Sequence, residues 1–206
     1  MIRAVLFDLD GVVRHFDHDP MLEETHSLTR GVIARTAFAS PLIEEVTTGR
    51  ITRAEWIARI GDAVGSPSAA AEWGRTSFHL DREITDLADE LRSRGIRCAI
   101  LTNGTDTIPA EAADSGLDRH FDPILNSAEI GYAKPDPRAF ASAVESLGVR
   151  PDEVLFTDDS ASKLAGAREL GMVTHHFMGV DGLSSAMREV GLPLSPARNT
   201  TVTHTL

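Results

Sequence analysis

The chain has 206 residues, 42% of them hydrophobic and 25% charged, and its formal net charge at pH 7 is -11. This composition excludes a wholly disordered chain, the length allows one core with a small insert, and the acidic charge argues against nucleic acid as a partner. The single cysteine, Cys98, excludes an intrachain disulfide, and no run reaches about 18 apolar residues, so we expect a cytoplasmic protein without a membrane partner.

The first part of the chain combines one predicted strand with a series of predicted helices. Residues 2–7 form an apolar run typical of a buried strand. Between residues 19 and 73 no strand is predicted, and apolar residues have helical spacing in residues 22–38 and 42–46. Thr52 and Glu55 form a capping-box pattern that predicts a helix through residue 63, and Ser66 precedes a further helix. We interpret this stretch as an insert after the first strand.

From residue 81 onward, predicted helices alternate with predicted strands. Asp81 is a candidate cap for a helix at residues 82–94, and further helices are expected at residues 137–147, 161–170 and 181–190. Apolar runs predict strands at residues 96–101, 123–125, 153–157 and 172–177. This alternation predicts an α/β fold with a doubly wound, Rossmann-like parallel sheet. We assign residues 1–14 and 81–206 to this core, residues 15–80 to a helical cap, and residues 194–206 to a flexible tail.

Polar residues follow the ends of several predicted strands. They are Asp8 and Asp10, Thr102 and Asn103, Lys134 in a loop, and Asp158 with Asp159. Ligands of open parallel sheets bind beyond the carboxyl ends of the strands, so these side chains are expected to converge. Converging carboxylates repel one another, and Mg²⁺ relieves that repulsion because it prefers oxygen ligands and leaves room for a substrate phosphate.

The same segments, in this order, resemble the four motifs of the haloacid dehalogenase superfamily. The resemblance is carried by residues 7–13, 101–103, 134–135 and 156–159, and it continues through residues 166–168 and Gly171. Residues 49–56 are similar to the caps of small sugar-phosphate phosphatases and of the N-terminal phosphatase domain of soluble epoxide hydrolase. The resemblance implies a phosphatase branch with a small helical cap of the first cap class and strand order 3-2-1-4-5.

The resemblance also implies catalytic roles. Asp8 is expected to attack phosphorus and form an aspartyl-phosphate, and Asp10 to protonate the leaving group and then activate water. Thr102, Asn103 and the backbone around Gly104 are expected to bind the phosphoryl oxygens, while Lys134 supplies a positive charge. Turn formation and helix capping are the structural alternatives for these residue types.

For the metal, the resemblance implies that Asp8 contributes a side-chain oxygen and Asp10 its backbone carbonyl. Asp159 is expected to be a direct ligand, and Asp158 to bind through water or to orient Lys134. The expected substrate is a small phosphorylated metabolite, with a sugar phosphate as one candidate.

Other conspicuous residues receive structural interpretations. His15, His18 and the pair at residues 175–176 lack the spacing of a zinc site. Trp56 and Trp73 are assigned to the core of the cap rather than to substrate stacking. Lys163 stands where many relatives have Asn, and we expect that difference to matter little.

Three alternatives to a phosphatase stay open from the sequence. A haloacid dehalogenase is disfavoured because it lacks the second aspartate that Asp10 supplies here. A phosphomutase would use the same aspartates, but residues 14–18 depart from the mutase pattern. A non-catalytic module on the same fold would be expected to have lost Asp8, Asp10 or the acidic pair, all of which are present.

Overall fold

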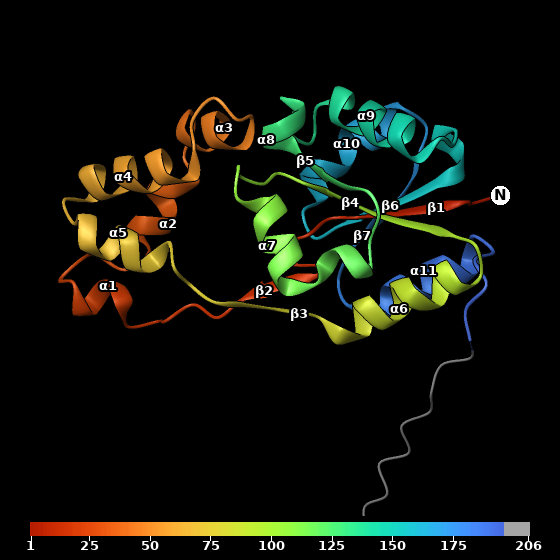
Figure 1. The fold of residues 1–206 in the computed structure, drawn as a ribbon, viewed down its shortest axis with the longest axis horizontal. Coiled ribbons are helices and arrows are strands. Elements are labelled where there is room, and N and C mark those ends of the chain that lie inside the picture. Colours follow the sequence, from red (N-terminus) through yellow and green to blue (C-terminus); the bar gives the residue numbers. More distant parts are fainter. Residues whose placement is uncertain (196–206) are drawn as a thin grey trace, which may run out of the picture.

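A five-stranded parallel sheet forms the centre of the molecule in the computed structural model, which describes residues 1–195 (Figure 1). Strand β1 (Ala4–Phe7) lies in the middle, between β4 (Arg97–Thr102) and β6 (Val154–Asp158). Strand β5 (Ile124–Asn126) continues the sheet beyond β4, and β7 (Val173–His176) continues it beyond β6. The order β5-β4-β1-β6-β7 confirms the predicted doubly wound topology.

Alternate residues of β1 belong to different cores, because successive side chains of a strand point to opposite faces. Val5 and Phe7 pack with α6 (Arg82–Ser93), α7 (Ile108–Ser115) and α11 (Val180–Glu189). Ala4 and Leu6 pack with α9 (Pro137–Leu147), η3 (Ala161–Leu164) and α10 (Ala165–Glu169). All four residues of β1 are fully buried, which holds the strand end rigidly in the centre of the sheet.

Five helices follow β1 in the chain and share a hydrophobic cluster of their own. They are α1 (Leu22–Thr25), α2 (Val32–Ala37), α3 (Leu42–Thr47), α4 (Arg53–Val64) and α5 (Pro67–Trp73). The cluster lies to one side of the sheet in Figure 1. Thr52 and Glu55 form the predicted capping box at the start of α4, so this boundary was predicted correctly.

The structure adds two details that the sequence pattern did not specify. Residues 22–38, which have helical spacing, divide into two helices, because the chain turns between them with positive φ at Ser27 and Gly31. Two short strands, β2 (Arg14–Phe16) and β3 (Phe78–Leu80), were not predicted, and they pair antiparallel where the chain leaves and re-enters the core. They are three residues long and only partly buried, so they carry little apolar pattern.

The remaining elements are short, namely η1 (Leu117–Arg119), α8 (Ser127–Ile130) and η2 (Pro151–Glu153). Among residues 1–195, no helix combines the length and the apolar character needed to cross a membrane. Most of the predicted flexible tail, residues 196–206, lies outside the described residues.

Cys98 lies in β4 and is 1% exposed, as expected for a structural thiol. Burial raises the pKa of the thiol to about 12. At pH 8 only about one thiol in ten thousand is therefore ionised, and the thiolate is the reactive form. We predict that an aromatic disulfide reagent labels Cys98 only after denaturation. Stoichiometric labelling of the folded protein at the rate of a free cysteine would contradict this prediction.

Candidate active site

The carboxylate of Asp8 lies in a buried cluster of charged side chains at the carboxyl end of β1. Its Oδ1 is 2.7 Å from Nζ of Lys134, and the same ammonium group is 2.7 Å from Oδ2 of Asp158. None of the three side chains is more than 2% exposed. Because β1 and β6 are neighbours, their strand ends place the two aspartates on either side of the lysine. The structure therefore brings together three predicted site residues that are far apart in the sequence.

Electrostatics keep Asp8 ionised despite its burial. Desolvation would raise the pKa of this carboxyl, but the charges of Lys134 and Lys163 and hydrogen bonds from Lys134 and Leu9 outweigh it. The pKa of Asp8 consequently lies below its ordinary value. For Asp158, desolvation raises the pKa and Lys134 only partly opposes the rise. An ionised carboxylate at Asp8 is the form that a nucleophile requires.

Asp8 and two further carboxylates could together hold a metal ion. Oxygens of Asp8, Asp158 and Asp159 all lie within 4.8 Å of one another. Oδ2 of Asp8 is buried and accepts no hydrogen bond from the described residues, which is unusual for a charged oxygen and fits an additional cationic partner. Gly11 makes room for the cluster, since a Cβ at this position would lie 2.3 Å from Oδ2 of Asp159. Oxygen donors of this kind fit Mg²⁺.

The two residues of the acidic pair have different surroundings. Both oxygens of Asp158 already have partners, since Oδ2 accepts from Lys134 and Oδ1 accepts from the backbone amide of Ser160 at 2.8 Å. Asp159 is exposed, and no hydrogen bond to its carboxylate is found among the described residues. This difference supports the prediction that Asp158 orients Lys134 while Asp159 is available to a metal ion.

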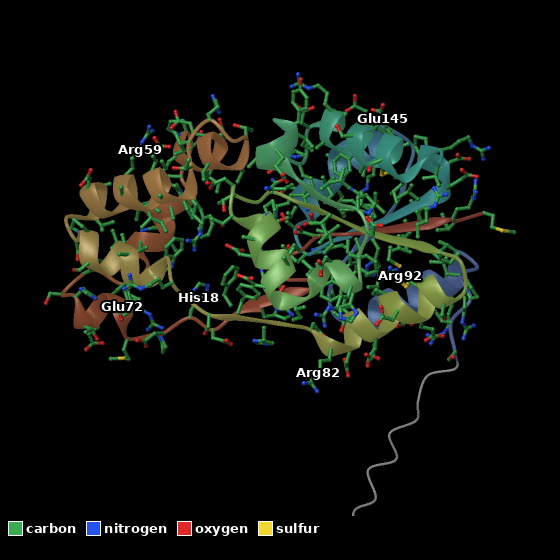
Figure 2. The ribbon with its side chains drawn as sticks, viewed as in Figure 1. His18, Arg59, Glu72, Arg82, Arg92 and Glu145 are labelled. Atoms are coloured by element: carbon green, nitrogen blue, oxygen red, sulfur yellow. The ribbon has the colours of Figure 1, made fainter. Side chains whose placement is uncertain are left out.

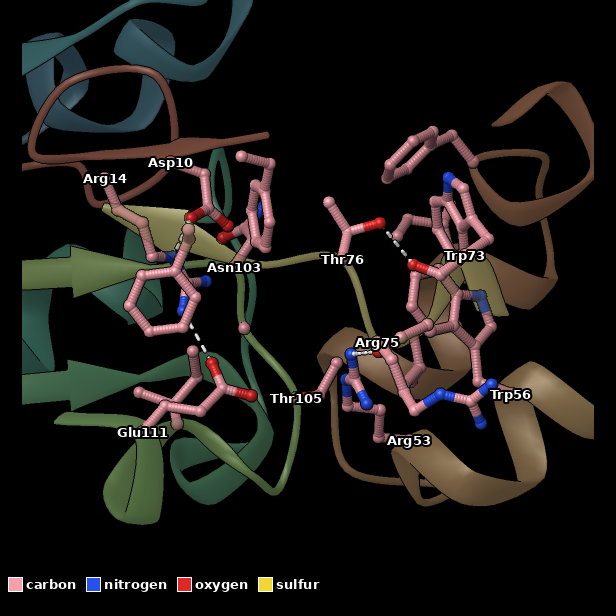
Figure 3. Close-up of a pocket in the computed structure, with 18 of the residues that line it drawn as sticks. Asp10, Arg14, Arg53, Trp56, Trp73, Arg75, Thr76, Asn103, Thr105 and Glu111 are labelled. Carbon is pink, nitrogen blue, oxygen red and sulfur yellow. Dashed lines mark hydrogen bonds and ion pairs between the residues drawn. The ribbon is translucent and has the colours of Figure 1, made fainter. Parts of the chain in front are cut away.

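Asp10 is held by an arginine that the sequence had not singled out. Nε of Arg14 donates to Oδ1 of Asp10 at 2.6 Å, and the second side of the guanidinium bonds to Glu111 at 2.6 Å. The Arg14 side chain is 5% exposed, whereas that of Asp10 is 42% exposed and faces the pocket in Figure 3. Desolvation raises the pKa of Asp10, although Arg14 acts in the opposite direction. A raised pKa suits a carboxyl that must both donate and accept a proton.

Asn103 fixes the position of the Lys134 loop. Its Nδ2 donates to the carbonyl of Lys134 at 2.8 Å, and its Oδ1 accepts from the Lys134 amide at 2.7 Å. The side-chain oxygen and one of the two N–H groups of the amide are thus engaged with the backbone of Lys134. Thr102 is the last residue of β4 and is 1% exposed, and Gly104 follows where a Cβ would meet Ile108 at 2.4 Å.

A cavity of about 360 Å³ opens beside Asp10 and extends to the helices α2–α5 (Figure 3). Asp10, Asn103 and Gly104 lie along it on the side of the sheet. The opposite wall includes Arg53, whereas Arg59 of the same helix points outward in Figure 2 and pairs with Glu45. Arg53 and Arg75 are the two arginines of residues 15–80 that line this cavity.

A sequence model of the protein family of haloacid dehalogenase-like hydrolases matches residues 2–171, which is most of the chain. The chain belongs to this hydrolase family. Haloacid dehalogenase-like hydrolases among the solved structures also share its fold. One from Bacteroides thetaiotaomicron, crystallised with magnesium and inorganic phosphate, has a TM-score of 0.69 at 25% identity and covers 85% of this chain and 93% of its own.

Curated relatives of this hydrolase have several activities. A phosphatase of Mycobacterium tuberculosis is 30% identical over 83% of the chain and 85% of its own length. Mouse bifunctional epoxide hydrolase 2 is 26% identical over 92% of the chain, but the chain spans only 38% of that protein. Bacterial (S)-2-haloacid dehalogenases match over 45% of the chain. Phosphatases are thus among the relatives, together with enzymes of other specificity.

Three residues of the site were missed or undervalued from the sequence. Arg14 stands four residues after Asp10, and this spacing alone does not predict their hydrogen bond. Glu111, the second partner of Arg14, lies 97 residues further along the chain. Lys163 had been given little weight, yet its Nζ is 3.6 Å from Oδ2 of Asp8. The sequence pattern does not show the contacts of Glu111 and Lys163, because they depend on how α7 and η3 are placed.

Proposed function

We propose that this hydrolase is a Mg²⁺-dependent phosphohydrolase that cleaves a small phosphomonoester through an aspartyl-phosphate at Asp8. The observation that carries the proposal is the state of Asp8, which is buried, ionised and paired with Lys134 next to further carboxylates. A carboxylate in water is a weak nucleophile, but one desolvated beside a cation and an electrophilic phosphate can form a covalent intermediate.

The first step transfers the phosphoryl group to the enzyme. A carboxylate oxygen of Asp8 forms a bond to phosphorus, the bond from phosphorus to the leaving oxygen breaks, and Asp10 donates its proton to that oxygen. In the second step Asp10 accepts a proton from water, which attacks phosphorus and breaks the bond to Asp8. The products are an alcohol and inorganic phosphate, and both aspartates return to their starting states.

Charge on the phosphoryl oxygens needs stabilisation in both steps. Lys134 supplies a fixed positive charge, and the backbone after Thr102 supplies hydrogen-bond donors. Mg²⁺, held by Asp8, Asp159 and the Asp10 carbonyl, would supply further positive charge to the phosphate. Asp158 acts by holding Lys134 in place.

The dehalogenase alternative is not favoured by this site. Arg14 and Glu111 hold Asp10 at the mouth of the pocket, and the acidic pair adds negative charge that a metal ion would balance. Dehalogenation by an attacking aspartate needs neither feature. A non-catalytic module would have no need for a buried Asp8 ionised against its desolvation cost.

The proposal is tested by measuring phosphate release from an aryl phosphate at neutral pH. We expect turnover with Mg²⁺, loss of activity in excess EDTA, and full recovery when Mg²⁺ is added back. Conversion of a phosphorylated sugar to an isomer without phosphate release would instead indicate a phosphomutase. Equal rates with Mg²⁺ and with EDTA would contradict the proposed metal dependence.

Lys163 is predicted to weaken metal binding, because its ammonium group lies 3.6 Å from the oxygen of Asp8 that has no hydrogen-bond partner. Replacing Lys163 with Gln removes this competing charge. We expect Mg²⁺ to bind about fivefold more tightly, measured as the Mg²⁺ concentration that gives half of the maximal thermal shift. Lys163→Arg keeps the charge and serves as the control. Unchanged or weaker binding in Lys163→Gln would contradict the prediction.

A further inference from the structure

The cavity beside Asp10 has two aromatic walls. On the side of α2–α5, Phe38, Trp56 and Trp73 form a cluster in which the two indole rings are 5.4 Å apart. Ring centroids of Phe38 lie 6.3 Å and 6.2 Å from those of Trp56 and Trp73. On the other side, Phe16 and Phe78 meet edge to face at 6.0 Å. Most of the surface beyond Asp10 is therefore apolar.

The cluster serves both as packing and as a wall of the cavity. Trp56 is 7% exposed, and its indole nitrogen donates to the carbonyl of Ala37 at 3.1 Å, which agrees with the predicted role in the cap core. Phe38, by contrast, is 59% exposed although it is a large hydrophobic residue. An exposed aromatic ring at a concave surface is typical of a binding site.

Polar side chains that line the cavity are largely paired within the protein. The guanidinium of Arg14 is shared between Asp10 and Glu111, and Arg53 donates to the carbonyl of Gly74. Several of the hydrogen-bonding groups that line the cavity are therefore already used within the protein.

Smaller polar groups show the same pattern. The hydroxyl of Thr76 donates to the carbonyl of Trp73 at 2.7 Å, and Thr105 shares a hydrogen bond of 2.9 Å with Thr107. His18 and Arg75 are exceptions, since neither side chain has a hydrogen bond or ion pair among the described residues, but both are exposed. A sugar ring placed against the paired groups would lose water from its hydroxyls and regain few hydrogen bonds, which is unfavourable.

We propose that this cavity binds an apolar leaving group, so that the preferred substrates are phosphomonoesters of hydrocarbon or aromatic alcohols rather than sugar phosphates. The inference rests on the proposed function, because the phosphate is placed at Asp8 and the alcohol portion extends past Asp10. A volume of about 360 Å³ suits a leaving group the size of one or two rings. Burial of its apolar surface against Phe38 and the two tryptophans supplies the selectivity.

The first test measures binding without hydrolysis. The chain has two tryptophans, and both line this cavity, so intrinsic fluorescence reports its occupancy. In the Asp8→Asn variant with Mg²⁺, cyclohexylmethyl phosphate and glucose 6-phosphate are titrated as ring-sized primary phosphates. We expect the cyclohexylmethyl compound to change the fluorescence and to bind at least about tenfold more tightly. Equal affinity, tighter binding of the sugar phosphate, or no response to either compound would overturn the inference.

The second test compares hydrolysis of the same pair by the wild-type protein. We expect kcat/KM to favour cyclohexylmethyl phosphate by about tenfold or more, and Phe38→Ser to reduce that ratio severalfold. Met178→Ser removes an 81% exposed hydrophobic residue outside the cavity and should leave the ratio unchanged. A ratio insensitive to Phe38→Ser would overturn the inference. Failure of the proposed function gives a different result, namely no phosphate release from either compound.

Discussion

Replacing Asp8 with Asn is expected to lower kcat by about four orders of magnitude or more. The substitution keeps the shape of the side chain but removes the charge that makes it nucleophilic. Lys134 still has Asp158 as a partner, so the variant should fold. Activity is measured as phosphate release from an aryl phosphate with saturating Mg²⁺, and folding by circular dichroism.

A matched control separates loss of chemistry from loss of charge at the site. Asp158→Asn removes a carboxylate that is equally buried and bonded to the same lysine. We expect it to retain more activity than Asp8→Asn, because Asp158 positions Lys134 and does not react. If Asp8→Asn retained wild-type turnover, the assignment of the nucleophile would be wrong.

Replacing Lys134 with Met is expected to destabilise the fold by about 3–5 kcal/mol, because two buried carboxylates lose their shared counter-charge. The lysine side chain is fully buried, and both ion pairs are 2.7 Å long. Part of the lost stability should return when Mg²⁺ is added, since a bound cation again balances the charge. The measurement is the free energy of unfolding from urea titrations in EDTA and in Mg²⁺.

Lys163 provides the matched control, because it is also a lysine beside Asp8 but is 30% exposed. Water screens its charge, so Lys163→Met should change the free energy of unfolding by less than about 1 kcal/mol. Similar effects of the two substitutions would mean that burial does not govern the contribution of Lys134.

The core of the fold was predictable because its pattern is local. The apolar run at residues 2–7 has buried neighbours on both sheet faces, and such continuous runs are typical of central parallel strands. Capping by Thr52 and Asp81 was likewise predicted, since these caps depend on residues within one helical turn. By contrast, β2 and β3 are partners 62 or more residues apart, and their pairing follows from how the chain enters and leaves the core.

The candidate site was predictable to a lesser degree. Strand ends of a parallel sheet meet at one edge, so Asp8 and the acidic pair could be expected together. Contacts from helices and loops gave no such signal. The bond of Arg14 to Glu111 and the approach of Lys163 to Asp8 depend on where α7 and η3 are placed. The aromatic cavity likewise required the packing of α2, α4 and α5 to be known.

The central claim, covalent catalysis by Asp8, is tested most directly by trapping the phosphorylated enzyme. In Asp10→Asn the intermediate should accumulate on 4-nitrophenyl phosphate, since this leaving group needs no proton whereas water activation does. Mass spectrometry after acid quenching should then find one phosphoryl group, labile to hydroxylamine, on the peptide that contains Asp8. Steady turnover with no phosphorylated Asp8, or a phosphoryl group on another residue, would contradict the account.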